Sequence, residues 1–527
     1  MLKWRCGLKC SMWGVGFEMW IYKYVLIILV MMIINISISN ADVGEMGFFC
    51  GVSEGVKLPK VMDSYVPITA RSNKKELRYK EMVFLRGKPE VFEGLLTISK
   101  SGDVDPSSKV EAGSYSMTYA LEAYKEPFVQ DVDIKRTIIF NVNYRKVDNQ
   151  VLKNYELKSW KETITIGEAK YTLDDTNSLF NNTIIEYNSP GIKYYKGSIG
   201  YRAIYKNDDQ VITVNVTGDN GIYGYDQAWG KTETQLLKIY VESVSGSDLN
   251  IWKLEAEVKP SITVNKTMQY DSNMPTAIAF GGNYLQVTQN QSGITYKVTN
   301  KPTNMDYNNV EGNISVPSYN TFEHLVAPEN TDYLKGSFAE EDIKKLYSLE
   351  VLDSKFEFIP NQKITRAQYV TLLVKALGLD KKYPEPKGYK PVKIFGDVDI
   401  YHPHFRNVEI AAQVQLIKGT NKGNFGPDNP IKREEAFVIY MRALGLSRLG
   451  QDITPTTPFI DDEQISGWAK KDIYGLYNLG IIKGDVTGNL RPKSEITKAE
   501  GAAIINRLIN YLRKDIENDY VEKLIEY

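Results

Sequence analysis

One segment of the chain occurs three times in register, and this repeat limits the possible folds more than any other feature. Residues 358–368, 425–435 and 490–500 read FIPNQKITRAQ, FGPDNPIKREE and LRPKSEITKAE, so a Pro, an Ile and a basic residue recur at fixed places. The basic residues are Arg366, Arg433 and Lys498, at intervals of 67 (366 to 433) and 65 (433 to 498) positions. A period of this size predicts three copies of one supersecondary unit.

Apolar residues on both sides of each repeat recur every three to four positions, which is the period of a helix with one apolar face. The first helix of each pair is expected near residues 343–349, 408–414 and 473–479, and the second helix is expected to begin at the basic residue. One such pair cannot bury its apolar face alone. We therefore predict three helix pairs packed around a shared axis, as an all-α pseudo-threefold bundle.

The preceding part of the chain has a different period. From residue 42 to residue 316 polar and apolar residues alternate, and Tyr, Val, Ile and Thr are frequent. Such alternation is typical of half-buried strands. We predict an antiparallel, sandwich-like β-rich region of one or two domains, and hence an α+β multidomain chain. Residues 317–335 lose the alternation and are expected to form a linker, so that the β-rich region folds without the helices.

The N-terminal residues have the features of an export signal. Four basic residues precede a short apolar run at residues 24–34, and small residues lead up to Ala41. We predict a signal peptide at residues 1–41, cleaved after Ala41, and no membrane contact afterwards. The alternative is an uncleaved anchor, but the run is shorter than the ~20 residues of a spanning helix. The chain has 64 Lys+Arg and 65 Asp+Glu, so no overall field would attract nucleic acid.

Two short motifs add to the repeat. Phe395-Gly-Asp397 and Phe459-Ile-Asp461 each precede the first helix of a pair. With them, the sequence resembles the S-layer homology (SLH) family, with modules at residues 336–379, 393–446 and 457–513 and a tail at 514–527. The resemblance implies an exported bacterial protein at the cell wall or surface layer. It also implies non-covalent binding to a secondary cell-wall polysaccharide bearing a ketal-linked pyruvate, and it leaves room for self-association in a surface layer.

The basic residue of each repeat is the main candidate for binding that polysaccharide. A cation at the first helical position opposes the helix dipole, which makes its recurrence informative. Free N–H groups at a helix start, together with a cation, form a site for an anion such as a carboxylate. We expect Arg433 to contribute most, and Lys498 less because an ammonium group cannot bind a carboxylate with two parallel bonds. The alternative is that these cations are solvated or ion-paired surface residues.

The neighbouring residues complete the expected site. Capping boxes are predicted at Thr365…Gln368 and Thr497…Glu500, whereas Lys432 replaces the capping Thr in the middle repeat. The resemblance implies that glycines shape the grooves between modules and that acidic and aromatic residues contact the sugar. These residues are Gly419, Gly484, Asp397, Asp461 and Trp468.

Enzyme motifs are not found. The sequence has neither His-Glu-x-x-His nor Gly-x-Ser-x-Gly, and His324, His402 and His404 all lie after residue 316, which excludes a His-based centre in the β-rich region. Residues 224–232 resemble a phosphate-binding loop but have five residues between the glycines, so we expect a surface turn with a packed Trp229. No metal or cofactor is expected. The prediction is a non-catalytic surface protein displaying a β-rich ectodomain of structural, adhesive or ligand-binding role. The alternative is a wall-anchored, glycan-active enzyme with a carboxylate pair there.

Overall fold

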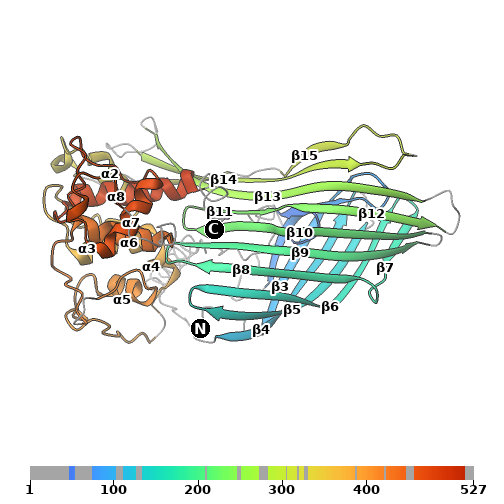
Figure 1. Ribbon diagram of the computed structural model, residues 1–527, viewed down its shortest axis with the longest axis horizontal. Coiled ribbons are helices and arrows are strands. Elements are labelled where there is room, and N and C mark those ends of the chain that lie inside the picture. The colour runs from blue at the N-terminus through green and yellow to red at the C-terminus, as the bar shows by residue number, and fades with distance from the viewer. Residues whose placement is uncertain are drawn as a thin grey trace, which may run out of the picture. The chain divides into compact units, whose positions relative to one another are not determined.

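The computed structural model describes a large part of one compact unit, which spans residues 42–527 (Figure 1). The described residues are 47–53, 74–102, 111–125, 133–207, 210–245, 251–271, 283–303, 305–316, 320–325, 330–385, 388–419, 423–446 and 456–516. The predicted signal peptide and residues 517–527 lie outside them. Within the described ranges, no helix combines the length and the apolar character needed to cross a bilayer.

The described strands belong to a single sheet of sixteen strands with antiparallel pairing throughout (Figure 1). The order is β1-β2-β3-β4-β5-β6-β7-β9-β10-β11-β13-β14-β15, while β8 pairs with β6 and β9, β12 pairs with β10 and β13, and β16 pairs with β14. The strands are β1 Gly51–Ser53, β2 Lys74–Val83, β3 Glu90–Gly102, β4 Ala112–Tyr124, β5 Ile134–Val147, β6 Gln150–Ile166, β7 Ala169–Leu173, β8 Leu179–Asn188, β9 Ile192–Asn207, β10 Gln210–Gln227, β11 Gly230–Gln235, β12 Leu237–Ser245, β13 Trp252–Asp271, β14 Asn283–Asn300, β15 Glu311–Val316 and β16 Thr321–Leu325. The predicted β-rich region is confirmed, and its strands are continuous in one sheet.

Sequence alternation explains which face of each strand is buried. Along β5, Ile138, Phe140 and Val142 are buried and alternate with more exposed residues. Phe48, just before β1, packs edge-on against Tyr119 of β4 and Phe140 of β5. It also contacts Phe180 of β8, which is separated from β5 by β6, so side chains of neighbouring strands share one aromatic core. In Figure 1 the early strands, in blue, cross behind the later strands, in green.

An ion-pair cluster lies within this core. The guanidinium of Arg136 donates to both carboxylate oxygens of Glu81 at 2.7 Å and to Oε1 of Glu162 at 2.5 Å. Its carbon lies 3.9 Å from the ring centre of Phe49, and Trp160 Nε1 donates to the other Glu162 oxygen at 2.9 Å. Burial raises the pKa of Glu81, and Arg136 offsets this only in part. The cluster joins β2, β5 and β6 by charge as well as by backbone pairing.

A small cavity beside this cluster is lined in part by Cys50. The cavity measures about 40 Å³ and is lined by Arg136, Glu81, Tyr201 and Tyr205 among others. The Cys50 sulfur lies 3.9 Å from the hydroxyl oxygen of Tyr201. Burial, and next the nearby charge of Glu81, raise the pKa of the Cys50 thiol to about 12.

The segment expected to be a linker contains regular structure. Strand β16, Thr321–Leu325, pairs with residues 284–288 of β14, and β15 pairs with residues 292–297 of the same strand. Because β14 is 18 residues long, it offers one edge to two short strands in succession. A 3₁₀ turn, η2 Asp332–Leu334, follows. The loss of alternation in the sequence therefore marked a short edge strand as well as a connection.

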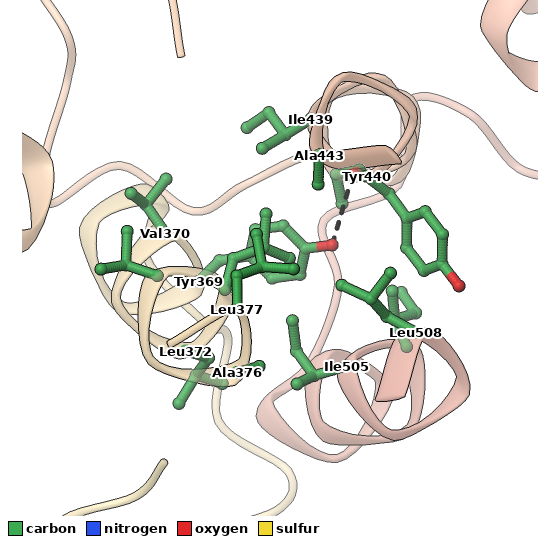
Figure 2. Packing of buried hydrophobic residues seen from close by; sticks show 14 of the residues in the cluster. Tyr369, Val370, Leu372, Ala376, Leu377, Ile439, Tyr440, Ala443, Ile505 and Leu508 are labelled. Carbon is green, nitrogen blue, oxygen red and sulfur yellow. Dashed lines mark hydrogen bonds between the residues drawn. The ribbon is translucent and has the colours of Figure 1, made fainter. Parts of the chain in front are cut away.

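The helices follow the sheet along the chain, as predicted. They are α2 Glu340–Ser348, α3 Arg366–Ala376, α4 Leu379–Lys382, α5 Phe405–Gln413, α6 Arg433–Leu444, the 3₁₀ turn η4 Asp462–Gln464, α7 Gly467–Asn478, α8 Lys498–Asn510 and one π-helical turn, η5 Tyr511–Asp515. Figure 2 shows α3, α6 and α8 packing through Tyr369, Ala443 and Leu508. The Tyr369 hydroxyl donates to the carbonyl of Ala436 across this contact at 3.2 Å.

We predict that replacing Arg136 with Met destabilises the β-rich region by about 3–5 kcal/mol, because two buried carboxylates lose their partner. Urea unfolding followed by tryptophan fluorescence measures the change. The matched control is Arg202→Met, which removes an exposed cation from β9 and should alter the free energy of unfolding by less than about 0.5 kcal/mol. An Arg136→Met protein as stable as the control would show that the cluster contributes nothing.

Candidate functional site

The three repeats meet through a closed ring of backbone hydrogen bonds. The N–H of Ile431 donates to the carbonyl of Ile364, Ile364 donates to Ile496, and Ile496 donates to Ile431, at 3.1–3.2 Å. Each of these isoleucines is the seventh residue of its repeated segment, in residues 358–368, 425–435 and 490–500. Each lies two residues before the basic residue that begins α3, α6 or α8. The ring therefore places the three helix starts next to one another.

The first two N–H groups of each of these helices are already occupied. In α3 they donate to Asn429 and Pro427, in α6 to Ser494 and Pro492, and in α8 to Gln362 and Pro360, at 2.7–3.1 Å. Each acceptor carbonyl belongs to the loop of another repeat. The expectation that these N–H groups are free to bind an anion is therefore wrong. An anion at these helix starts would have to be bound by side chains.

The predicted capping boxes are confirmed. The hydroxyl oxygens of Thr365 and Thr497 accept from the N–H groups of Gln368 and Glu500, both at 3.2 Å. The Gln368 and Glu500 side chains accept in return from the capping residues at 3.1 and 2.8 Å. Lys432 gives α6 no side-chain cap, as expected, although its backbone N–H donates to Glu435 at 2.9 Å.

Arg366 is bonded to the second repeat. Its Nε donates to the carbonyl of Phe425 at 2.9 Å, and its Nη1 lies 2.9 Å from a carboxylate oxygen of Glu435. The guanidinium carbon is also 5.0 Å from the ring centre of Phe425. This cation is therefore compensated by a carboxylate of the neighbouring repeat.

Arg433 makes the equivalent contact to the third repeat. Its Nη2 donates to Oε1 of Glu500 at 2.5 Å. Burial alone would raise the pKa of Glu500, but the bond from Arg433 and those from Thr497 outweigh it and hold the pKa below its usual value. Glu435 and Glu500 occupy the same position, the third of their helices. Sequence reasoning assigned Glu500 only to capping and overlooked Glu435.

Lys498 differs from the two arginines. The position equivalent to Glu435 and Glu500 in the first repeat is the neutral Gln368. Lys498 is only 8% exposed, and its ammonium donates to Oε1 of Gln362 at 2.9 Å and lies 5.4 Å from the ring centre of Phe358. Within the described residues it has no ion pair, and burial lowers its pKa. Lys498, which is expected from sequence to contribute less to anion binding than Arg433, is thus the basic residue that has no carboxylate partner among the described residues.

The two opening aspartates hold the loops that precede α6 and α8. Asp397 accepts from the N–H groups of Phe425 and Gly426 at 2.7 Å, and Asp461 accepts from Leu490 and Arg491 at 2.8 and 2.7 Å. Burial would raise the pKa of Asp397, but the two backbone bonds keep it lowered. The carboxylates therefore position the loops, which is a different role from direct contact with a sugar.

The remaining predicted residues lie on the same loops and on α7. A Cβ added at Gly419 would come within 2.9 Å of the Phe395 ring, and one added at Gly484 would lie 3.0 Å from the backbone of Gly488. Both glycines therefore permit close loop packing. Trp468, the second residue of α7, is 57% exposed and available to a ligand. Among the described residues no cluster of His, Cys, Asp and Glu is placed to hold a metal ion.

The model of the S-layer homology domain matches residues 394–437 and 458–502. Two segments of the chain are therefore similar to S-layer homology domains. The predicted first module, residues 336–379, is not part of the match. The protein is therefore an extracellular surface protein anchored at the cell wall or surface layer.

The relatives include enzymes and structural proteins. The chain is 30% identical over 180 residues to an amylopullulanase from Thermoanaerobacterium thermosulfurigenes, covering 33% of this chain and 9% of that protein. It is 30% identical over 153 residues to a cellulosome-anchoring protein from Acetivibrio thermocellus, covering 28% and 33%. It is 34% identical over 154 residues to the S-layer protein sap from Bacillus anthracis, covering 29% and 17%. The chain thus spans at most a third of the length of any of the three.

We predict that Glu500→Gln weakens the acid sensitivity of the helical part. A carboxyl with a lowered pKa in the folded state stabilises the fold above its unfolded pKa, and this contribution is lost as the pH falls. Gln keeps the capping oxygen but removes the ion pair, so the variant should lose about 0.5–1 kcal/mol at pH 7 and little at pH 3. Urea unfolding followed by helical circular dichroism at both pH values measures this.

The control for this prediction is Glu463→Gln, which neutralises an exposed carboxylate before α7. It should leave the difference between pH 7 and pH 3 unchanged. Equal effects of the two substitutions would contradict a specific contribution from the Arg433–Glu500 pair.

Proposed function

We propose that residues 336–379, 393–446 and 457–513 are three SLH modules in a pseudo-threefold bundle that binds a pyruvylated secondary cell-wall polysaccharide. In this proposal the bundle anchors the chain and the β-rich region is displayed as a structural, adhesive or ligand-binding ectodomain. The supporting observation is the buried ammonium of Lys498, which has no carboxylate partner among the described residues. A ketal-linked pyruvate would supply that carboxylate.

The first repeat belongs in this proposal although the family model does not match it. Its Ile364 is one of the three members of the backbone ring, and its Thr365 forms the same capping box as Thr497. Its loop carbonyls also accept from the first two N–H groups of α8. Without the first repeat, the ring would be open and the start of α8 would lack two acceptors.

The charges distinguish the three junctions. At two of them a ligand carboxylate must compete with Glu435 or Glu500, which already bond the arginine. At the third, the ammonium of Lys498 has three N–H donors, of which one meets Gln362. Phe356, on the same loop as Phe358, is exposed and offers a face on which a sugar can stack. We therefore assign the main anion site to the junction between α8 and the first repeat.

No observation favours the glycan-cleaving alternative at the buried carboxylates of the β-rich region. Glu81 and Glu162 share one guanidinium and are both buried. The adjoining cavity of about 40 Å³ has room for a few water molecules at most and is too small for a sugar ring.

We predict that Lys498→Met weakens binding to purified, polysaccharide-bearing walls about tenfold, or ~1.4 kcal/mol, because the uncompensated cation is lost. Gln368→Glu should have a similar effect, since it keeps the capping box and adds a carboxylate where the other two helices have one. Arg433→Met should change binding less than threefold, because that cation is already paired. Sedimentation of the protein with walls, before and after extraction of the polysaccharide, measures the affinity.

The control is Lys432→Met, which removes an exposed cation beside the α6 start and tests for a general charge effect. Circular dichroism verifies that each variant is folded. The assignment to Lys498 is wrong if Arg433→Met abolishes binding while Lys498→Met does not. The proposed function itself is wrong if the unchanged protein binds extracted walls as tightly as complete ones.

A further inference from the structure

We propose that two turns of the β-rich region form a docking element for the C-terminal ends of the three repeat helices. The turns lie between β8 and β9, at residues 189–191, and between β10 and β11, at residues 228–229, and the strand residues that flank them take part. The partner surface is formed by the ends of α3, α6 and α8 with η5. The sheet and the helices would then fold as one cooperative body, which goes beyond the anchoring proposed above.

The strongest observation is that all three helix ends receive donors from these turns. The last carbonyls of a helix have no partner within the helix. The carbonyl of Ala376 in α3 accepts from Trp229 Nε1 at 2.8 Å. Ala443 in α6 accepts from the N–H of Gly191 at 2.8 Å. Leu512, just beyond α8, accepts from Gln227 Nε2 at 2.7 Å.

Apolar contact accompanies these hydrogen bonds. Ile192, Tyr225 and Trp229 are buried and belong to the same apolar cluster as the helical core, whereas the other buried strand residues pack mostly in the core of the sheet. Trp229 is only 8% exposed. The expected turn with a packed Trp229 is confirmed, but it is not a surface turn, because the helical part covers the indole.

The backbones approach closely, which favours an adapted surface over a chance contact. Gly445, directly after α6, has φ = +68°, and a Cβ there would lie 1.6 Å from the hydroxyl oxygen of Ser189. A Cβ at Gly191 would lie 2.8 Å from the carbonyl oxygen of Ala443. Both glycines are therefore required at this contact for space, and Gly445 also for its left-handed backbone.

Polar contacts also order the β10–β11 turn itself. The Gln227 side-chain oxygen accepts from the N–H of Trp229 at 2.7 Å, so one amide bridges the turn and the carbonyl of Leu512. The guanidinium of Arg513 lies 4.3 Å from the Trp229 ring centre, and burial lowers its pKa to about 10. Lys266 of β13 donates to the carbonyl of Ala228 at 2.9 Å.

The location of this contact separates two roles within each helix. The basic residues lie at the N-terminal ends of α3, α6 and α8, and the two turns of the sheet contact the C-terminal ends. A helix of 11 residues, such as α3, is ~17 Å long, so docking leaves the proposed polysaccharide site uncovered. Removing the helices would expose Trp229, Tyr225 and Ile192 together. The sequence led us to expect that the β-rich region folds without the helices. In this proposal it needs the helices to cover these three side chains.

A cut between the two parts of the complete, folded chain tests the proposal. A protease site is inserted between residues 326 and 329, and the protein is cleaved after folding and passed over a size-exclusion column at micromolar concentration. We expect the two pieces of the unchanged protein to elute together. The double variant Trp229→Ala with Gln227→Ala should weaken their association at least 100-fold, so that they elute apart.

Two further variants make the result specific. Trp229→Phe keeps the ring and removes only the indole N–H, and it should weaken association about tenfold. Tyr401→Ala removes an exposed aromatic side chain from the helical part and should have no effect. Separate elution of the unchanged pieces, or equal behaviour of the double variant and Tyr401→Ala in folded proteins, would overturn the proposal. Wall binding measured on the same variants distinguishes this outcome from failure of the anchoring function.

Discussion

The helical part depends on the exchange of backbone hydrogen bonds between repeats. Each repeat supplies loop carbonyls to the helix start of another, and the three isoleucine residues close the exchange into a ring. An N–H group left without a partner in a dry interior costs about 1–3 kcal/mol, so a single repeat would begin its second helix at a disadvantage. This reciprocal dependence gives a physical reason for the threefold repetition in the sequence.

The same exchange determines which cation remains available. Arg366 and Arg433 each pair with the Glu at the third position of another repeat's helix. The first repeat has the neutral Gln368 at that position, and Lys498 donates to the loop residue Gln362 instead. A capping box forms with either Glu or Gln at the third helix position, so the capping pattern does not reveal the difference in charge. A change from Glu to Gln keeps the local helix start and alters the charge of the junction.

Patterns within short stretches of sequence predicted the strands and helices well. They did not predict the contacts between residues that are far apart in the sequence. The strands, the helix pairs and the caps at Thr365 and Thr497 follow from periodicity and from spacing within a few residues. The pairing of Arg433 with Glu500 spans 67 positions, and no local pattern specifies it. The same limit applies to the ring through Ile364 and to the contact of Trp229 with Ala376. The repeat period, combined with opposite charges at the first and third helix positions, could have indicated the ion pairs.

The position of Cys50 affects how an exported protein endures oxidising surroundings. Attack on a disulfide or a peroxide requires the thiolate, and a thiol whose pKa is raised to about 12 supplies almost none near neutral pH. The surrounding aromatic side chains also keep larger oxidants away from the sulfur. Crowded copies on a cell surface would therefore remain free of accidental covalent cross-links through this residue for as long as the sheet stays folded.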